Sequence, residues 1–189
     1  MLEDMFDPSE SLSIRPISRA EYDRMVEAGI LGEDDHVELL RGQLVEMSPI
    51  GWQHNEVITW LTEALIRQID PIFQVRPQCS FAADDWSEPE PDLAVRRKDP
   101  SLRAHPTSLL LVIEISDSSL RKDRGLKLKI YAGAGVPEYW IFDLQHECVE
   151  VYTGPSGETY AEKRTLRSGE VLRPTHVPGI AIVLADMPR

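Results

Sequence analysis

Two acidic residues stand beside short apolar segments, where charged side chains are unexpected. Glu114 lies within the aliphatic segment 109–115, and Asp92 directly precedes the apolar segment 93–95. Because burying an unpaired carboxylate is costly, Glu114 must lie at a strand end, be paired or hold a cation. Carboxylates at the ends of neighbouring strands are suitable ligands for Mg²⁺, which prefers hard oxygen atoms. Taken singly, either residue could instead be a solvent-facing acid at a strand end or in a turn.

A lysine further along the chain could supply positive charge to the same site. Asp123, Lys127 and Tyr131 follow one another at steps of four, so they share one face of the helix predicted after Glu114. Hydrolysis of a phosphodiester bond is assisted by a cation near the attacking water and the charged transition state. Lys127 could serve such hydrolysis, or it could form an ordinary ion pair with Asp123.

The elements that must position these residues can be predicted from hydrophobic periodicity and turn residues. Apolar residues recur at three- and four-residue steps over 52–69, which predicts the longest helix. The nearly continuous aliphatic segment 109–115 predicts a central strand covered on both faces. The other predicted elements are strands at 72–81, 92–96 and 138–143, hairpins at 36–48 and 148–165, and helices at 19–28 and 119–132. Together they indicate a mixed sheet with helices, an α/β or α+β fold.

Length and composition indicate one globular domain. The chain has 189 residues, with 20 Lys and Arg residues against 32 Asp and Glu residues, and a net charge of −12. No apolar run approaches the ~20 residues that cross a bilayer, and the acidic first ten residues do not match a signal peptide. We therefore expect a cytoplasmic protein without membrane contact. Two cysteines cannot build a disulfide framework or a thiolate zinc site. We expect an N-terminal arm over residues 1–17 and a single domain over residues 18–189.

Several short motifs resemble a known group of enzymes. Pro91-Asp92, followed by Glu114-Ile115-Ser116 at the end of an aliphatic strand, resembles the PD-(D/E)XK nuclease superfamily, with Ser116 in the position of the usual motif lysine. Within this superfamily the chain is similar to a branch of bacterial restriction-endonuclease-like proteins. The similarity to this branch is carried, in order, by the segments 38–49, 91–95, 112–119 and 131–143.

The resemblance implies a fold and a metal site. The fold would be a restriction-endonuclease-like core, a mixed central sheet flanked by helices, with additional N-terminal and C-terminal β-hairpins. Asp92, Glu114 and the backbone carbonyl of Ile115 would bind Mg²⁺, for which Mn²⁺ can substitute. Lys127, on the following helix, would take the place of the missing motif lysine.

Two further residues match positions that the branch favours. Glu38 would be an additional acidic ligand or would hold a water molecule, unless it is a solvent-facing strand residue. His54 would take part in catalysis, unless it only caps the start of the long helix. The resemblance thus adds Glu38 and His54 to the predicted catalytic residues.

The leading hypothesis is a Mg²⁺-dependent endonuclease that hydrolyses phosphodiester bonds in DNA. The alternative is a catalytically silent interaction or DNA-binding module, because a fold does not dictate one function. In that case the aromatic strand 139–142 and the terminal hairpin could form a homodimer surface. A third hypothesis keeps the same site but acts on RNA or a nucleotide.

The net charge of −12 disfavours nucleic acid as a partner, because phosphate binding depends on Lys and Arg. Basic residues nevertheless gather in 96–103, with four against one acid, and in 119–129, with five against one acid. Both segments follow a strand that carries a candidate metal ligand. We therefore predict a positive rim beside an acidic metal pocket.

Overall fold

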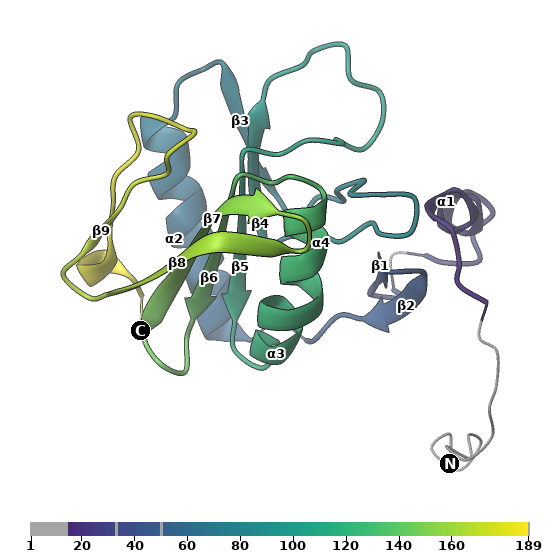
Figure 1. Cartoon of the computed structure of the whole chain (residues 1–189), viewed down its shortest axis with the longest axis horizontal. Coiled ribbons are helices and arrows are strands. Elements are labelled where there is room, and N and C mark those ends of the chain that lie inside the picture. The colour runs from purple at the N-terminus through teal and green to yellow at the C-terminus, as the bar shows by residue number, and fades with distance from the viewer. Residues whose placement is uncertain (1–14, 33, 50, 189) are drawn as a thin grey trace.

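A six-stranded mixed sheet forms the centre of the computed structural model, which describes residues 15–32, 34–49 and 51–188 (Figure 1). The strand order is β3-β4-β5-β6-β7-β8, and β5 and β6 are parallel whereas the other neighbours are antiparallel. The strands are β3 (Phe73–Pro77), β4 (Leu93–Arg97), β5 (Leu111–Ser116), β6 (Glu138–Asp143), β7 (Cys148–Ser156) and β8 (Thr159–Arg167).

Helical segments cover both faces of this sheet (Figure 1). Helix α2 (Trp52–Gln68) packs on one face, and α3 (Leu120–Lys122), a π-helical turn (Asp123–Lys127) and α4 (Leu128–Gly133) form one continuous segment near the other. Successive side chains of a strand point to opposite faces. Ile113 and Ile115 of β5 join the core beneath α2, whereas Val112 packs with Tyr131 of α4. Glu114 therefore faces the α3–α4 side.

A hairpin of β1 (Val37–Leu40) and β2 (Gln43–Glu46) lies beside the main sheet, next to α1 (Arg19–Glu27) (Figure 1). Its two turn residues, Arg41 and Gly42, have φ angles of 50° and 77°, as tight hairpin turns require. The Gly42 amide donates a hydrogen bond to the Trp86 carbonyl, and Leu39 pairs with Glu88 in the loop before β4. The hairpin is thereby fixed to the loop that leads to Asp92.

The remaining elements complete the C-terminal part of the chain. A small sheet of β9 (Val171–Leu172) and β10 (Ile182–Val183) precedes a short 3₁₀ turn (Leu184–Asp186). Ile182 and Leu184 pack in the core beneath α2. No helix among the described residues is long and apolar enough to span a membrane.

The predicted fold class is confirmed, including the hairpins near both ends of the chain. The C-terminal hairpin, β7 and β8, does not stand apart but extends the central sheet. The predicted helix 119–132 is interrupted by a π-helical turn, in which the Leu128 amide bonds the Asp123 carbonyl, five residues earlier. The predicted arm lies, apart from its last three residues, outside the described part of the chain.

Candidate active site

A cleft of about 600 Å³ lies at the end of the sheet where β4 begins and β5 ends. These two ends coincide because the strands are antiparallel, with Leu93 opposite Ile113. The cleft is also bordered by the β1–β2 hairpin, the first turn of α2 and the segment that starts with α3. All the residues predicted from the sequence to form the site line it, namely Glu38, His54, Asp92, Glu114, Ile115 and Lys127.

Asp92 is held in place by two donors on one of its carboxylate oxygens. Oδ2 accepts a hydrogen bond from the Ile115 amide at 2.7 Å and is 3.1 Å from His54 Nε2. Oδ1 has no protein donor within the described residues, and Asp92 lines the cleft. One oxygen of Asp92 is therefore fixed by the protein, and the other is available to a ligand.

Glu114, near the end of β5, has a similar arrangement. It is 3% exposed, and its Oε1 accepts hydrogen bonds from Lys127 Nζ at 2.9 Å and from the Tyr131 hydroxyl at 2.6 Å. Oε2 has no such donor in the described part of the chain. Burial raises the pKa of Glu114 well above its usual range, against the effect of Lys127, and the charge of Asp92 raises this pKa further.

The backbone of Ile115 faces the same space. In an extended strand the N–H and C=O groups of one residue point to the same side, and the Ile115 N–H points to Asp92. The Ile115 carbonyl therefore lies on the side of Asp92 and His54.

The pKa of His54 is raised by the same neighbours. Burial lowers this pKa, but the hydrogen bond and charge of Asp92, together with the Ile115 backbone, outweigh the effect of burial.

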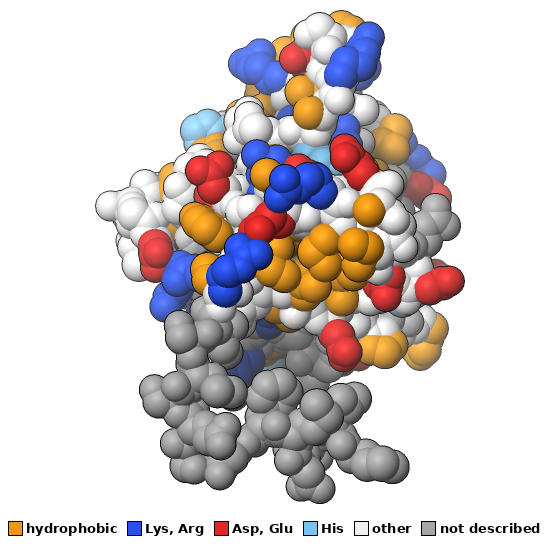
Figure 2. Space-filling model, turned by 90° about the vertical axis from the view of Figure 1, so that its right-hand side faces the viewer, with side chains coloured by type: hydrophobic (Ala, Val, Ile, Leu, Met, Phe, Trp, Pro, Cys, Tyr) orange, Lys and Arg blue, Asp and Glu red, His pale blue; other side chains and the backbone are white. Residues whose placement is uncertain are grey.

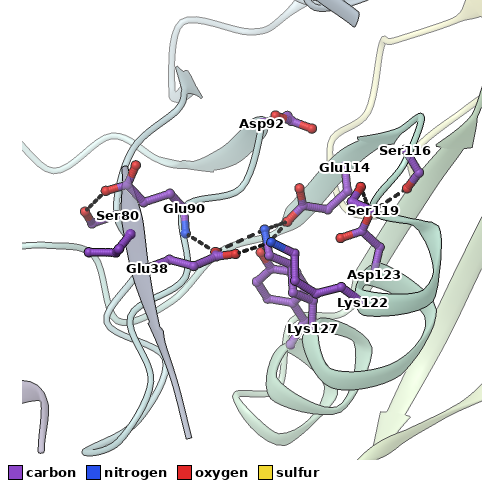
Figure 3. A network of polar contacts seen from close by, with 12 residues as sticks. Glu38, Ser80, Glu90, Asp92, Glu114, Ser116, Ser119, Lys122, Asp123 and Lys127 are labelled. Atoms are coloured by element: carbon purple, nitrogen blue, oxygen red, sulfur yellow. Dashed lines mark hydrogen bonds and ion pairs between the residues drawn. The ribbon is translucent and has the colours of Figure 1, made fainter. Parts of the chain in front are cut away.

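Lys127 does not pair with Asp123, the ordinary alternative to a role in the site. Its Nζ lies 2.9 Å from Glu114 Oε1 and 3.1 Å from Glu38 Oε2, and its side chain is only 5% exposed (Figure 3). Asp123 instead accepts hydrogen bonds from the hydroxyls of Ser116, at 2.6 Å, and Ser119. Ser116, in the position of the usual motif lysine, thus fixes the segment that carries Lys127.

Glu38 is fully buried and is not a solvent-facing strand residue. Oε1 pairs with Lys122 Nζ at 2.9 Å, and Oε2 contacts Lys127 Nζ and accepts a hydrogen bond from the Glu90 amide (Figure 3). Both oxygens are therefore engaged by protein donors. Glu38 is a counter-ion for two lysines in this structure.

His54 lies in the first turn of α2, but its side chain does not cap the helix. The N-cap residue is Gly51, and Nε2 of the His54 ring contacts Asp92. Its other nitrogen, Nδ1, is buried without a hydrogen-bond partner among the described residues. The alternative of a simple capping role is thus wrong.

Two further residues belong to this network and were not predicted to act in it. Lys122 precedes Lys127 by five residues, a spacing that in a regular α-helix separates two side chains by about 140° and so gives no sign of a shared site. Tyr131 was placed on the correct helix face, but its bond to Glu114 required knowing which strand that face would contact. The π-helical turn, whose hydrogen bonds join residues five apart, brings both lysines to Glu38.

The predicted positive rim is wrong for the segment 96–103. Asp92 precedes β4, so the residues that follow this strand lie at the opposite end of the sheet from the cleft. In the other basic segment, Arg124 pairs with Asp143 and Glu150. The cleft itself is lined by six acidic residues and two lysines, and both lysines are ion-paired.

The sheet is mixed, has helical segments on both faces and carries two carboxylates at the adjoining ends of β4 and β5. These features define a PD-(D/E)XK-like fold. The model of the family Uma2, described as "Putative restriction endonuclease", matches residues 19–185. The chain therefore belongs to the Uma2 family. This membership supports a nuclease, and restriction-endonuclease-like nucleases usually use divalent metal ions.

A solved structure supports the fold independently. It is a crystal structure from Anabaena variabilis ATCC 29413, described as "a putative nuclease belonging to DUF820", and it superposes with a TM-score of 0.72. The two chains are 15% identical, and the match covers 91% of this chain and 97% of the other. No curated protein matches the sequence.

Proposed function

We propose that this chain is a Mg²⁺-dependent endonuclease, able to use Mn²⁺, that hydrolyses phosphodiester bonds in DNA. The observation that carries the proposal is the pairing of Asp92 and Glu114 in one cleft. Each carboxylate has one oxygen fixed by protein donors and one without a donor among the described residues. Donors that orient a ligand from behind are typical of metal sites.

The residues present fit a hard divalent cation. Asp92, Glu114 and the Ile115 carbonyl would hold it, and all three supply the oxygen atoms that Mg²⁺ prefers. The excess of acidic residues around the cleft favours a bound cation. When bound, such a cation polarises the phosphate and lowers the pKa of a coordinated water.

Lys127 acts in this proposal as a fixed positive charge and not as a general base. Burial lowers its pKa, but Glu114, Glu38 and Asp123 outweigh that effect and raise the pKa above its usual range. The ammonium therefore keeps its proton. It holds Glu114 Oε1 and places positive charge near the pentavalent transition state.

His54 and Glu38 position the charged groups. His54 holds Asp92 through Nε2, so that Asp92 Oδ1 stays directed to the cleft. Glu38 fixes the ammonium groups of both lysines. Both carboxylate oxygens of Glu38 are engaged by protein donors, which leaves Asp92 and Glu114 as the acidic ligands.

The proposal is tested with supercoiled plasmid and Mg²⁺ or Mn²⁺, comparing the wild-type protein with Asp92→Asn and Glu114→Gln. Loss of a residue that only orients a metal ligand costs ~10–100-fold in metal affinity or activity, so loss of a direct ligand should reduce cleavage by at least about 100-fold. Glu147→Gln is the matched control, because this exposed residue lies on the turn before β7 and outside the cleft. Unchanged cleavage in both site variants would refute the assignment.

Thermal unfolding with and without Mg²⁺ separates the nuclease from the catalytically silent module. Because a ligand stabilises the state that binds it, Mg²⁺ should raise the melting temperature of the wild type and of Glu147→Gln, but not that of Asp92→Asn. A folded wild-type protein that shows neither cleavage nor stabilisation by Mg²⁺ or Mn²⁺ would favour the silent interaction module.

A further inference from the structure

Lys122 is a second lysine in the cleft, and its surroundings differ from those of Lys127. Both ammonium groups contact the carboxylate of Glu38 (Figure 3). The Lys122 side chain is 21% exposed, whereas that of Lys127 is 5% exposed. Lys122 is therefore the more accessible cation at this site.

The number of free N–H groups separates the two lysines further. An ammonium group has three N–H donors. Lys127 Nζ contacts both Glu114 Oε1 and Glu38 Oε2 inside the protein. Lys122 Nζ contacts only Glu38 Oε1 within the described residues, at 2.9 Å. Two donors of Lys122 are thus left for an anion that enters the cleft.

Glu38 holds the Lys122 ammonium in position but accepts only one of its three N–H donors. This carboxylate is fully buried and is shared by two lysines, while Lys127 has Glu114 as a second partner. A lysine that is oriented in advance loses less side-chain entropy when it binds a phosphate. Lysine also suits a phosphate oxygen, because its ammonium is a compact point charge.

The backbone explains why both lysines reach Glu38. The π-helical turn Asp123–Lys127 sits between them, and π-helical turns occur frequently at functional sites. Without this turn, side chains five residues apart would diverge by about 140° around the helix. The local geometry therefore places a second, partly exposed positive charge beside the candidate metal ligands.

We propose that Lys122 is a substrate-binding residue that contacts a phosphate of the bound polynucleotide, whereas Lys127 is an internal counter-ion of Glu114. This assignment rests on the nuclease function proposed above. It predicts separate kinetic effects for the two residues, because Lys122 acts on substrate binding and Lys127 on the charge around the metal ligands.

The test is steady-state cleavage of a labelled DNA oligonucleotide by Lys122→Gln and Lys122→Arg at several salt concentrations. Gln can still donate to Glu38 but carries no charge, and Arg keeps the charge. For Lys122→Gln we expect KM to rise about 10-fold, because one charged hydrogen bond to the substrate is lost. We expect kcat to stay within about 3-fold of the wild-type value. The slope of log KM against log salt should fall by about 0.7–1.

Arg121→Gln is the matched control. It removes the same charge at the neighbouring position, where the Arg121 side chain is exposed and lies outside the cleft. We expect wild-type KM and salt slope for Arg121→Gln, and KM within about 3-fold of wild type for Lys122→Arg. Unchanged KM and salt slope in Lys122→Gln would overturn the proposal. If Lys122→Gln unfolds, a salt slope in Lys122→Arg equal to that of the wild type supports it, and a slope reduced by about 1 overturns it.

Binding of the same oligonucleotide without cleavage separates this inference from the proposed function. Fluorescence anisotropy in Ca²⁺ should show weaker binding and a smaller salt slope for Lys122→Gln than for Arg121→Gln. If the wild-type protein cleaves no DNA but shows this difference, the nuclease proposal fails and the role of Lys122 stands. If the wild-type protein does not bind the oligonucleotide, the role of Lys122 is overturned as well.

Discussion

The Tyr131 hydroxyl donates the shorter of the two hydrogen bonds to Glu114, at 2.6 Å, and the Tyr131 side chain is fully buried. Tyr131→Phe would remove a hydrogen bond to the carboxyl group that is paired with Lys127, and we expect a loss of about 1.5–3 kcal/mol in the free energy of unfolding. Tyr160→Phe is the comparison, because the Tyr160 hydroxyl donates to the neutral carbonyl of Val136 at 2.9 Å. The free energy of unfolding of Tyr160→Phe should fall by about 0.5–1.5 kcal/mol.

Urea unfolding at pH 7 measures both free energies. An equal loss in the two variants would mean that the Tyr131 hydrogen bond is no stronger than that of Tyr160. A larger loss in Tyr131→Phe would show that the ion pair of Glu114 with Lys127 strengthens the Tyr131 hydrogen bond.

A site residue could be predicted from the sequence where its charged side chain stands within or beside an apolar segment. Glu114 interrupts an aliphatic strand and Asp92 begins an apolar one, so both were candidates without any knowledge of their neighbours. Lys122 could not be predicted, because its role depends on Glu38, which is 84 residues away in the sequence. Its only local signal, a spacing of five residues from Lys127, argues for separate faces in a regular helix.

At the scale of elements, the π-helical turn is the feature on which the site depends. Inserting one alanine after Gly125 would place Lys122 six residues before Lys127, a spacing that separates the two side chains by about 120° in a regular α-helix. Because small misplacements of catalytic groups cost on the order of 100-fold in rate, we expect a comparable loss of DNA cleavage. Far-UV circular dichroism should show that the fold is retained.

Gly125→Ala is the matched control for this insertion, because it adds an alanine side chain but keeps the chain length. An added Cβ at Gly125 has no neighbouring atom within 4 Å, so Ala fits without strain. We expect it to stabilise the helix by about 0.5–1 kcal/mol and to retain cleavage. Full activity in the insertion variant would show that the site does not depend on how the π-helical turn spaces the two lysines.

The elements themselves could largely be predicted, but their directions in the sheet could not. Alternation and length indicated the strands, and periodicity indicated α2. The segment 96–103 was placed beside the site because the sequence does not show that β4 begins where β5 ends. The π-helical turn escaped prediction because it depends on tertiary contacts of Asp123 with Ser116 and of Lys127 with Glu114.

At the scale of the whole molecule, charge constrains what the protein can bind. On the face shown in Figure 2, Lys and Arg side chains are interspersed with Asp and Glu and do not form a continuous basic track. The net charge is −12, and the cleft is itself acidic. Binding of DNA should therefore be weak and sensitive to salt unless a cation occupies the cleft. The predicted homodimer stays a prediction.

A second charged network connects the helical segment to the sheet and should control unfolding in acid. Glu150 of β7 pairs with Arg124 at 2.9 Å and with Lys163 of β8 at 2.6 Å, and it accepts a hydrogen bond from the Tyr152 hydroxyl. Burial raises the pKa of Glu150, but the hydrogen bonds from Arg124, Lys163 and Tyr152 outweigh this and lower the pKa to about 2. The network thus favours the ionised carboxylate in the folded state.

Because the pKa of Glu150 falls from its ordinary value of 4.5 to about 2 on folding, the unfolded chain binds this proton first as the pH drops. The stabilisation by Glu150 is complete above pH 4.5 and is lost as the pH falls to about 2. Glu150→Gln should therefore be less stable than the wild type at pH 7, and the difference should shrink between pH 4.5 and pH 3, as measured by urea unfolding. Glu162→Gln, at an exposed position of β8, should show no such convergence. A difference between Glu150→Gln and wild type that stays constant over this range would contradict the assigned pKa.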